Sequence, residues 1–352
     1  MKSEQLNFIQ FIPESVSEAD VGDILALQVE AFKESNPNDP VPPEALLRQN
    51  LDMLSNHPLY NVKYYLVKNS EHKPVARLMM LFGKPDTEDY EAQKHMCLIN
   101  LTVASAHRRQ GIGTEILKFV VKELEGTGVT LLQTDTGFDS GRAFSNHFGA
   151  EIAIESRDSR VNVADLNWEM LEKWNEEGEK SNPDVRIDLF AGLPDDKDIE
   201  AYSRLYTEVF NQQPFDDIEG LEVSWTPDKL REIHARMAEM GSTDYVMITR
   251  EANGDISGLT ELAYNPERSH RMGQGLTGVQ ESYRGRGLGK WLKAKMLFYM
   301  RDNFPDVEHV ATTNASSNEA MLSINDRLGF KLYKHNTAYK IPVSELAKKL
   351  CE

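Results

Sequence analysis

The feature that most limits how this chain can fold is an internal duplication. Residues 111–113 read Gly-Ile-Gly and residues 287–289 read Gly-Leu-Gly, about half of the 352-residue chain apart. Each glycine pair follows a strand-like apolar segment and opens an amphipathic helical pattern. Because similarity at a fixed distance is the signature of repeated structural units, the sequence predicts two copies of one fold.

The segments around the two turns follow the same plan. Strands are expected at 6–12 and 185–190, and each is followed by two helices, the second starting at a proline. β-rich runs at 62–68 and 245–250 lead into a third strand, and each half closes with a strand and a short helix. This order predicts the α/β class, as two tandem copies of an α+β fold with a mixed sheet.

The repeat also sets the expected domain boundaries. Residues 1–176 and 183–352 are predicted to form two domains, joined by a linker at 175–184 that is rich in Glu, Gly, Ser and Pro. The chain length agrees with this division, since single hydrophobic cores usually stop growing at about 250–300 residues.

Charge excludes several classes of function. The chain carries 39 Lys and Arg against 56 Asp and Glu, a formal net charge of −17. Both halves are acidic, which argues against a nonspecific nucleic-acid binder and against a polybasic membrane-surface protein. The acid excess suits a cationic partner and simple solubility equally well.

Cysteines and hydropathy point to an ordinary soluble protein. Cys97 and Cys351 form no CxxC pair, so neither a metal site nor a disulfide framework is expected. No apolar signal segment follows the N-terminus, and the apolar runs are too short to span a bilayer. We therefore expect a cytoplasmic protein, with its oligomeric state left open.

A glycine turn at the start of a helix has a specific chemistry. The first four N–H groups of a helix have no partner within the helix, and glycine lets the backbone approach a ligand closely. Together with the positive end of the helix dipole, these amides form an anion site. Neither turn contains the P-loop pattern G-x-x-x-x-G-K-[ST], and neither fits a Rossmann G-x-G-x-x-G site.

Both turns share the pattern R-x-x-G-x-G, made by Arg108, Gly111 and Gly113 and by Arg284, Gly287 and Gly289. In this position, after a fourth strand and opening a third helix, the pattern resembles the acyl-CoA pyrophosphate motif of the GNAT superfamily of N-acetyltransferases. The second half also closes with Leu-Gly-Phe at 328–330, similar to the end of the family's late helix. The first half has a weaker Phe-Gly-Ala at 148–150. The resemblance covers essentially the whole chain.

The resemblance implies a V-shaped gap between the fourth and fifth strands, which holds the pantetheine arm of acetyl-CoA. It implies that the Val103 and Val279 regions supply a backbone N–H to the thioester carbonyl, whose oxygen gains charge during attack. The pyrophosphate would lie on the two turns, where Arg109 and Arg286 are either extra contacts or ordinary surface charges. The predicted contacts in the turns are Arg108, Arg109, Gln110, Gly111, Ile112, Gly113 and Thr114, and Arg284, Gly285, Arg286, Gly287, Leu288, Gly289 and Lys290.

Polar residues after the predicted fifth strand are the next candidates. In the family an Asn in this region commonly contacts the pantetheine or the acetyl group, which implies that role for Asn314 and Asn318. Asn318 suits a helix N-cap equally well, since Asn favours both turns and caps. The first half has Asp135 in place of the amide, which puts its catalytic competence in doubt.

Proton transfer needs separate candidates. Many family members carry a Tyr four residues before the closing glycine, where this chain has Ser145 and Asn325. A thiol with a pKa of about 8.5 can leave without an acid, so this loss does not exclude activity. Glu261, on the expected third strand of the second half, is the candidate general base, with a solvated carboxylate as the alternative. The matching stretch 76–80 has no acid.

Two functions follow. The first is an N-acetyltransferase that moves an acetyl group from acetyl-CoA, its co-substrate, to a primary amine by direct attack. Its chemistry would lie in the second half, with Glu261, Asn314 and Val279 in the active site. The acceptor would be a small-molecule or peptide amine, with a weak preference for a cationic one. The second function is a noncatalytic protein that binds or senses acyl-CoA, with one or both domains idle. Nothing supports a nucleic-acid, membrane or metal partner.

Overall fold

The computed structural model describes residues 5–54, 57, 60–218 and 223–352. The chain forms two compact units, each assembled from separate segments. The first unit contains Met1–Ile154, Asp217–Gly220 and Asn336–Glu352, and the second contains Glu155–Asp216 and Leu221–His335. The predicted class, an α/β protein with mixed sheets, is confirmed.

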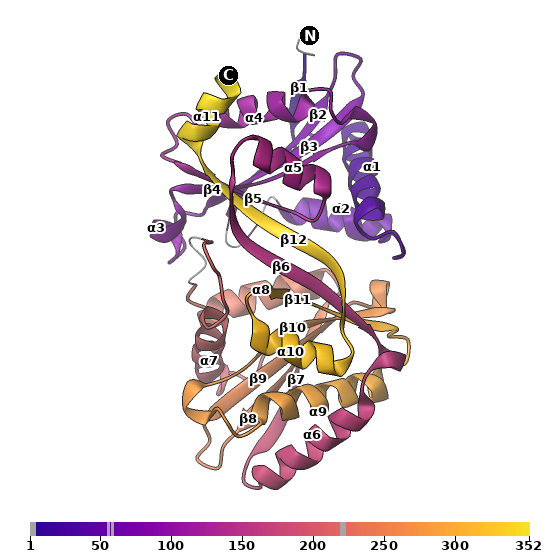
Figure 1. The fold of residues 1–352 in the computed structure, drawn as a ribbon, viewed down its shortest axis with the longest axis vertical. Helices are drawn as coiled ribbons and strands as arrows, with labels where there is room; N and C mark the ends of the chain where they lie inside the picture. The colour runs from indigo at the N-terminus through magenta and orange to yellow at the C-terminus, as the bar shows by residue number, and fades with distance from the viewer. Residues whose placement is uncertain (1–4, 55–56, 58–59, 219–222) are drawn as a thin grey trace. The chain divides into compact units, whose positions relative to one another are not determined.

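In the first unit the sheet order is β1-β2-β3-β4-β5-β12. All neighbours are antiparallel except β4 and β5, which run parallel. Helices α1 and α2 pack on one face of the sheet, and α4 and α11 pack on the other (Figure 1). The strands are β1 (Asn7–Gln10), β2 (Tyr60–Lys68), β3 (Pro74–Gly83), β4 (Met96–Val103), β5 (Leu131–Thr136) and β12 (Lys331–Pro342). The helices are α1 (Glu18–Ser35), α2 (Glu44–Met53), α3 (Tyr90–Gln93), α4 (Ile112–Glu123), α5 (Asp139–His147) and α11 (Val343–Cys351).

The second unit repeats this plan in the order β6-β11-β10-β9-β8-β7, with β10 and β11 parallel. One face of its sheet is covered by α7 and α8, and the other by α6 and α9 (Figure 1). The strands are β6 (Glu151–Asn162), β7 (Arg186–Ala191), β8 (Thr243–Arg250), β9 (Ile256–Tyr264), β10 (Arg271–Val279) and β11 (His309–Ala315). The helices are α6 (Trp168–Ser181), α7 (Ile199–Asn211), α8 (Pro227–Glu239), α9 (Leu288–Asn303) and α10 (Glu319–Leu328).

The two sequence repeats exchange their last strands. β6 belongs to the first repeat but pairs with β11 of the second unit, from Asn162↔His309 to Ser156↔Ala315. β12 belongs to the second repeat but pairs with β5 of the first unit, from Pro342↔Leu131 to Thr337↔Thr136. The compact units therefore differ in extent from the predicted segments 1–176 and 183–352. The sequence pattern could not reveal the exchange, because the alternation of apolar and polar residues in each strand suits pairing with either neighbouring strand.

The prediction of a linker at 175–184 is wrong for most of that segment, because α6 continues to Ser181. Leu171, Trp174 and Gly178 lie on one face of α6 and are buried, and the helix packs on α9. The Trp291 indole donates a hydrogen bond to Asn175, and Lys295 pairs with Glu179 at 2.7 Å. The Glu-rich composition therefore belongs to the exposed face of a packed helix.

Gly178 gives a direct test of this packing. A Cβ at this position would overlap the Trp291 ring, so we expect Gly178→Ala to lower the free energy of unfolding by about 1–3 kcal/mol. The matched control is Gly22→Ala in α1, where a Cβ meets no atom within 4 Å. That variant is expected to be stabilised by about 0.5–1 kcal/mol. Equal effects of the two substitutions in urea unfolding would contradict the close approach of α6 to α9.

Candidate active site

A fork opens between the two parallel strands of each unit. β4 and β5 pair only from Met96↔Leu131 to Ile99↔Thr134, although β4 runs on to Val103. β10 and β11 pair only from Arg271↔His309 to Gly273↔Ala311, although β10 runs on to Val279. The gap that the family resemblance predicts is therefore present in both units. The ends of β4 and β10 keep backbone groups on their fork side for a ligand.

The glycine turns follow directly on these strands. Gly111 and Gly287 adopt φ of 87° and 80°, and each is the N-cap of the helix that follows. In this left-handed conformation a side chain would be strained, so glycine is favoured at both positions. Arg109 and Gly285 share the same conformation, with φ of 61° and 83°. The turns thereby direct the first N–H groups of α4 and α9 outward, as an anion site requires.

The first arginine of each motif fastens its turn to the strand. Arg108 Nε donates to the carbonyl of Val103 at 3.0 Å, and Arg284 Nε donates to that of Val279 at 3.2 Å. The outer ends of the two guanidinium groups differ. Arg108 forms two hydrogen bonds with the Glu34 carboxylate, at 2.6 and 2.5 Å, which raises the pKa of Arg108 and neutralises its charge. Arg284 instead donates to the neutral amide of Gln212.

Other charges around the turns also favour the second unit for an anion. α4 carries Glu115 in its first turn, whereas α9 has no acid there and carries Lys290. Arg286 donates to Glu251 and to Asn182, so its charge is balanced. A negative side chain near a helix N-terminus repels an anionic ligand. Glu115 pairs with Lys118, and Glu281 and Glu208 adjoin the second turn, so acids lie near both turns. The second turn differs in that Lys290 begins α9 and Arg284 has a neutral partner.

The remaining predicted turn residues divide by burial. Ile112 and Leu288 are buried and anchor their helices rather than facing a ligand. Gln110 donates to the carbonyl of Ala106. A Cβ on Gly113 would lie 2.9 Å from the Phe144 ring, whereas one on Gly289 would meet only Val279 at 3.6 Å. Gly113 is therefore fixed by packing, and Gly289 borders open space. Thr114 follows Gly113 in the first turn of α4.

The two forks differ in a β-bulge, which only the fork of the second unit has. The pairing of β10 with β9 shifts register between Gln274 and Thr277, whereas β4 pairs with β3 without a shift. Glu261 of β9 lies at this bulge, where its Oε2 accepts a hydrogen bond from the Leu276 N–H at 3.3 Å. A Cβ on Gly275 would lie 3.0 Å from the same oxygen. Bulges often occur next to active sites, where they redirect backbone groups.

Glu261 is buried and its acidity is altered. It is 7% exposed, and the Tyr202 hydroxyl donates to its Oε1 at 2.7 Å. Burial, assisted by the charge of Asp244, raises the pKa of Glu261 to about 8. Burial also raises the pKa of Asp244 to about 6 and lowers that of His234 to about 4. This environment makes Glu261 a much stronger base than a solvated carboxylate.

The first unit lacks these acids. Val246 pairs with Glu261 in the second unit, and the matching pair in the first unit is Tyr64 and Met79. Met79 packs against the core under α1 and α2. The first unit therefore has neither the bulge nor a carboxylate at this place.

Asn314 and Asn325 meet inside the second fork. The Asn325 amide, which is 2% exposed, donates to Asn314 Oδ1 at 2.8 Å. Asn318 serves as the N-cap of α10 by accepting from the Met321 N–H, so its amide oxygen has the capping role. The N–H groups of Leu131 and His309, the first residues of β5 and β11, donate to the carbonyls of His95 and His270, which precede β4 and β10. Leu131 therefore corresponds to His309, and by the same offset Thr136, rather than Asp135, corresponds to Asn314.

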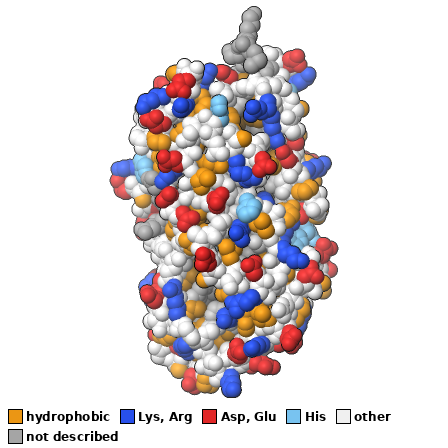
Figure 2. Space-filling view, in the orientation of Figure 1, with side chains coloured by type: hydrophobic (Ala, Val, Ile, Leu, Met, Phe, Trp, Pro, Cys, Tyr) orange, Lys and Arg blue, Asp and Glu red, His pale blue; other side chains and the backbone are white. Residues whose placement is uncertain are grey.

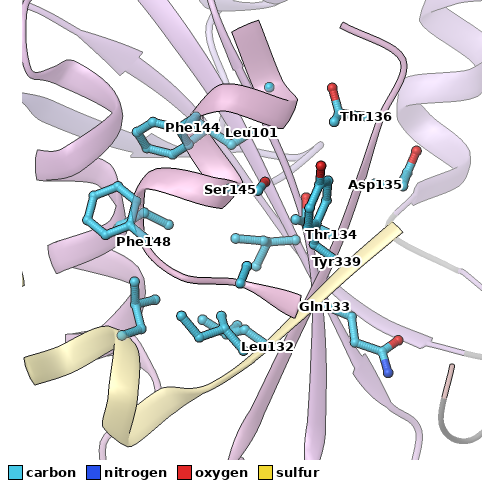
Figure 3. A pocket seen from close by; sticks show the side chains of 16 residues that line it. Leu101, Leu132, Gln133, Thr134, Asp135, Thr136, Phe144, Ser145, Phe148 and Tyr339 are labelled. Carbon is cyan, nitrogen blue, oxygen red and sulfur yellow. The ribbon is translucent and has the colours of Figure 1, made fainter. Parts of the chain in front are cut away.

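The fork of the first unit encloses a cavity of about 100 Å³. Phe144 of α5 and Phe148, which follows that helix, lie on one side of it and Thr134 of β5 on another (Figure 3). Most of its lining is apolar, including Ile99, Leu101, Leu117, Leu132, Ile341 and Leu346. The last two belong to the exchanged strand and to α11, so the C-terminal segment completes this cavity.

Several groups near the site escaped the sequence interpretation. In the second unit Tyr202 and Lys293 are buried and Asp244 is half-buried, yet each reads in the sequence as an ordinary helix or strand residue. The bulge alone left a signal, because glycine inside a strand is typical of one and β10 contains Gly273, Gly275 and Gly278. Within the described ranges, no group of His, Cys, Asp or Glu is arranged to hold a metal ion, and no helix is long and apolar enough to cross a membrane.

Comparisons with known proteins agree with this architecture. The family model of the acetyltransferase (GNAT) family matches residues 24–148 and 200–330. The chain therefore belongs to the GNAT acetyltransferase family and contains two copies of its domain. No curated protein matches the chain significantly.

Solved structures resemble the chain over nearly its full length. A tandem GNAT protein from the clavulanic acid biosynthesis pathway aligns with a TM-score of 0.75 at 19% identity, covering 96% of this chain and 99% of that one. A GCN5-related N-acetyltransferase from Sphaerobacter thermophilus aligns with a TM-score of 0.64 at 14% identity, covering 96% of both chains. N-myristoyltransferase from Saccharomyces cerevisiae, with bound myristoyl-CoA, gives 0.56 at 12%, covering 95% of this chain and 82% of that one. These likenesses establish the tandem GNAT fold.

Proposed function

We propose that the chain transfers an acetyl group from acetyl-CoA to a primary amine, with the chemistry in the second unit. The observation that carries this proposal is the β10 bulge with Glu261 against it, a combination that the first unit lacks. The glycine turn of the second unit supports the same choice, because Lys290 and an Arg284 with a neutral partner suit the anionic pyrophosphate of the donor.

In the proposed reaction the neutral amine attacks the thioester carbonyl, a C–N bond forms and the C–S bond breaks. Glu261 takes the proton that the amine loses, and the thiolate leaves and is protonated by water. Val279 and the neighbouring amides at the end of β10 bind the carbonyl oxygen as it gains charge. Asn314, held by Asn325, would orient the pantetheine or acetyl group from β11.

The first unit fits a binding role without transfer. Its fork and glycine turn are intact, but its fork is apolar, Arg108 is neutralised by Glu34, and no carboxylate lies at the bulge position. A donor held there would meet no carboxylate at the position that matches Glu261, although Asp135 lines the cavity. The alternative function, acyl-CoA binding or sensing in both units, requires that the second unit be idle as well.

The acceptor is proposed to be a small-molecule or peptide amine. The net charge of −17 suits a cationic acceptor. On the face shown in Figure 2, Lys and Arg side chains are interspersed with Asp and Glu, rather than gathered in one basic patch that nucleic acid would need. A cytoplasmic location is proposed on the sequence alone.

Acetyl-CoA binding and CoA release test this function together. Titration of acetyl-CoA into the full-length protein is expected to give one or two sites, and CoA release is expected with at least one acceptor from a panel of small amines and peptides. Gly289→Glu is expected to weaken binding at the second unit at least about tenfold, since it places a negative charge at the anion site. A Cβ fits there without a clash, so the fold should persist.

The outcomes separate the two functions. Binding without CoA release for any acceptor would favour the sensing protein. Complete absence of acetyl-CoA binding would overturn both functions. The Gly22→Ala variant, remote from the turns on α1, is the control for nonspecific loss of binding.

A further inference from the structure

Helix α9 of the second unit carries a buried lysine with no partner for its charge. Lys293 of α9 is 3% exposed. No hydrogen bond or ion pair to Lys293 is found among the residues that the structure describes, and burial alone lowers its pKa to about 8. Lysine is almost never fully buried unless it is paired. No contact within the described core of the second unit explains why a lysine is buried here.

Helix geometry places Lys293 toward the fork. It lies one turn after Gly289 on the same face of α9, and Gly289 adjoins Val279 at the end of β10. Leu292 instead packs on Gly258 of β9. The corresponding residue of the first unit, one turn after Gly113, is Leu117, which lines the cavity in that fork. The same position in the second unit holds a cation.

Correspondence with Leu117 also assigns Lys293 to the level of the bulge. In the first unit Leu117 shares its cavity with Ile99 and Leu101 of β4. In the second unit, the residues of β10 that pair with the matching positions of the neighbouring strand are Gln274 and Thr277, which flank the bulge. The bulge is where the proposed reaction places the acyl end of the donor, with Glu261 on the other face of the sheet.

The rest of the second fork is polar where the first is apolar. Gln274 and Thr260 are buried and hydrogen bonded to each other and to Thr277. On the opposite wall, Asn325 Oδ1 is buried and has no hydrogen-bond partner among the described residues. An apolar acyl chain would leave the Lys293 ammonium without a partner, which is unfavourable. An acyl group that ends in a carboxylate would pair with it.

We propose that the second fork binds acyl-CoA donors whose acyl group ends in a carboxylate, and that Lys293 is the residue that selects them. The inference rests on the proposed function, because it assumes that a CoA thioester lies in this fork. The carboxylate pairs with the Lys293 ammonium, which a donor with a methyl end cannot do. Acetyl-CoA fits the same fork but leaves the lysine unpaired.

Matched donors test the inference by binding alone. Succinyl-CoA and butyryl-CoA have acyl chains of similar length and differ in the terminal carboxylate. Isothermal titration of the full-length protein is expected to show succinyl-CoA binding at least about tenfold more tightly than butyryl-CoA. Lys293→Met, of similar length and without charge, is expected to remove this preference while retaining acetyl-CoA binding. Leu117→Met, the matched change in the first unit, is expected to leave the preference intact.

Stability of the variants is checked in the same samples. Lys293→Met is expected to melt at or above the temperature of the native chain, because it removes an unpaired buried charge. Lys293→Gln, which keeps a polar end, should lose the preference as well and serves if the first variant fails to fold.

The results separate the two levels of the proposal. Equal affinity of the native protein for succinyl-CoA and butyryl-CoA, or a preference that survives both Lys293 variants, would overturn the role of Lys293. Acetyl-CoA binding in those experiments would leave the proposed function standing. Failure of every CoA thioester to bind would overturn the proposed function itself.

Discussion

Glu261→Gln is expected to reduce acyl transfer by about 100-fold or more while acetyl-CoA binding changes little. General base catalysis typically contributes 10²–10⁴ in rate, and the amide of glutamine cannot accept the proton. The substitution preserves shape, and its oxygen can still accept from Tyr202 and Leu276. The measurement is kcat/KM for CoA release, with the dissociation constant of acetyl-CoA determined in parallel.

An exposed carboxylate provides the control for this prediction. Glu267→Gln, in the turn that follows β9, removes an equal charge outside the fork and should leave the rate unchanged. Activity of Glu261→Gln close to that of the native chain would show that Glu261 is structural. In that case the buried carboxyl only stabilises the bulge, by accepting the hydrogen bond from the Leu276 N–H.

The pKa of Glu261 also fixes the direction of the pH dependence. Because the base must be deprotonated to act, kcat/KM of the native chain should rise with pH and level off above about 8. Stability should move the opposite way. The folded state holds this proton more tightly than the unfolded chain, so native stability falls as pH rises from about 4.5 through 8, by at most about 4–5 kcal/mol. Glu261→Gln should lack this loss in thermal unfolding at pH 9.

The exchanged strands predict that the two sequence repeats cannot be separated. A fragment of residues 1–176 lacks β12 and α11, so β5 becomes an open edge and the core loses Leu346, which is 1% exposed. A fragment of residues 183–352 lacks β6 and leaves β11 with an open edge. We expect each fragment by itself to aggregate and to show no cooperative unfolding, since unpaired strands promote association.

Coexpression is the control for the fragments. Residues 1–176 and 177–352 produced together should copurify and unfold cooperatively, because each then receives its missing strand. If either fragment alone were a soluble monomer with a sharp thermal transition, the repeat would be able to close on its own last strand. The exchange would then be dispensable.

The sequence predicts the fold better than the site. The repeated R-x-x-G-x-G pattern locates both turns because a glycine at positive φ followed by a helix leaves a local signature. The strand exchange has no such signature, since pairing partners are chosen by packing over long range. The burial of Lys293 and the contact between Asn314 and Asn325 also depend on distant segments meeting.

The bulge is an intermediate case. β10 has 9 residues and β4 has 8, a difference that alignment of the two repeats can reveal only after the strand ends are known. Gly275 indicates a bulge but does not indicate that Glu261 faces it. Residue type and strand position in the sequence indicate Glu261 as a base, whereas its raised pKa follows from burial that the sequence does not reveal.

The exchanged strands also reverse the order in which the chain can be completed during synthesis. Domains usually fold as they emerge, from the N-terminus onward. Here every segment of the second unit, ending at His335, precedes Asn336–Glu352, which the first unit requires. The unit that contains the earliest residues therefore keeps an incomplete sheet until β12 has been synthesised, with the edge of β5 unpaired in the meantime.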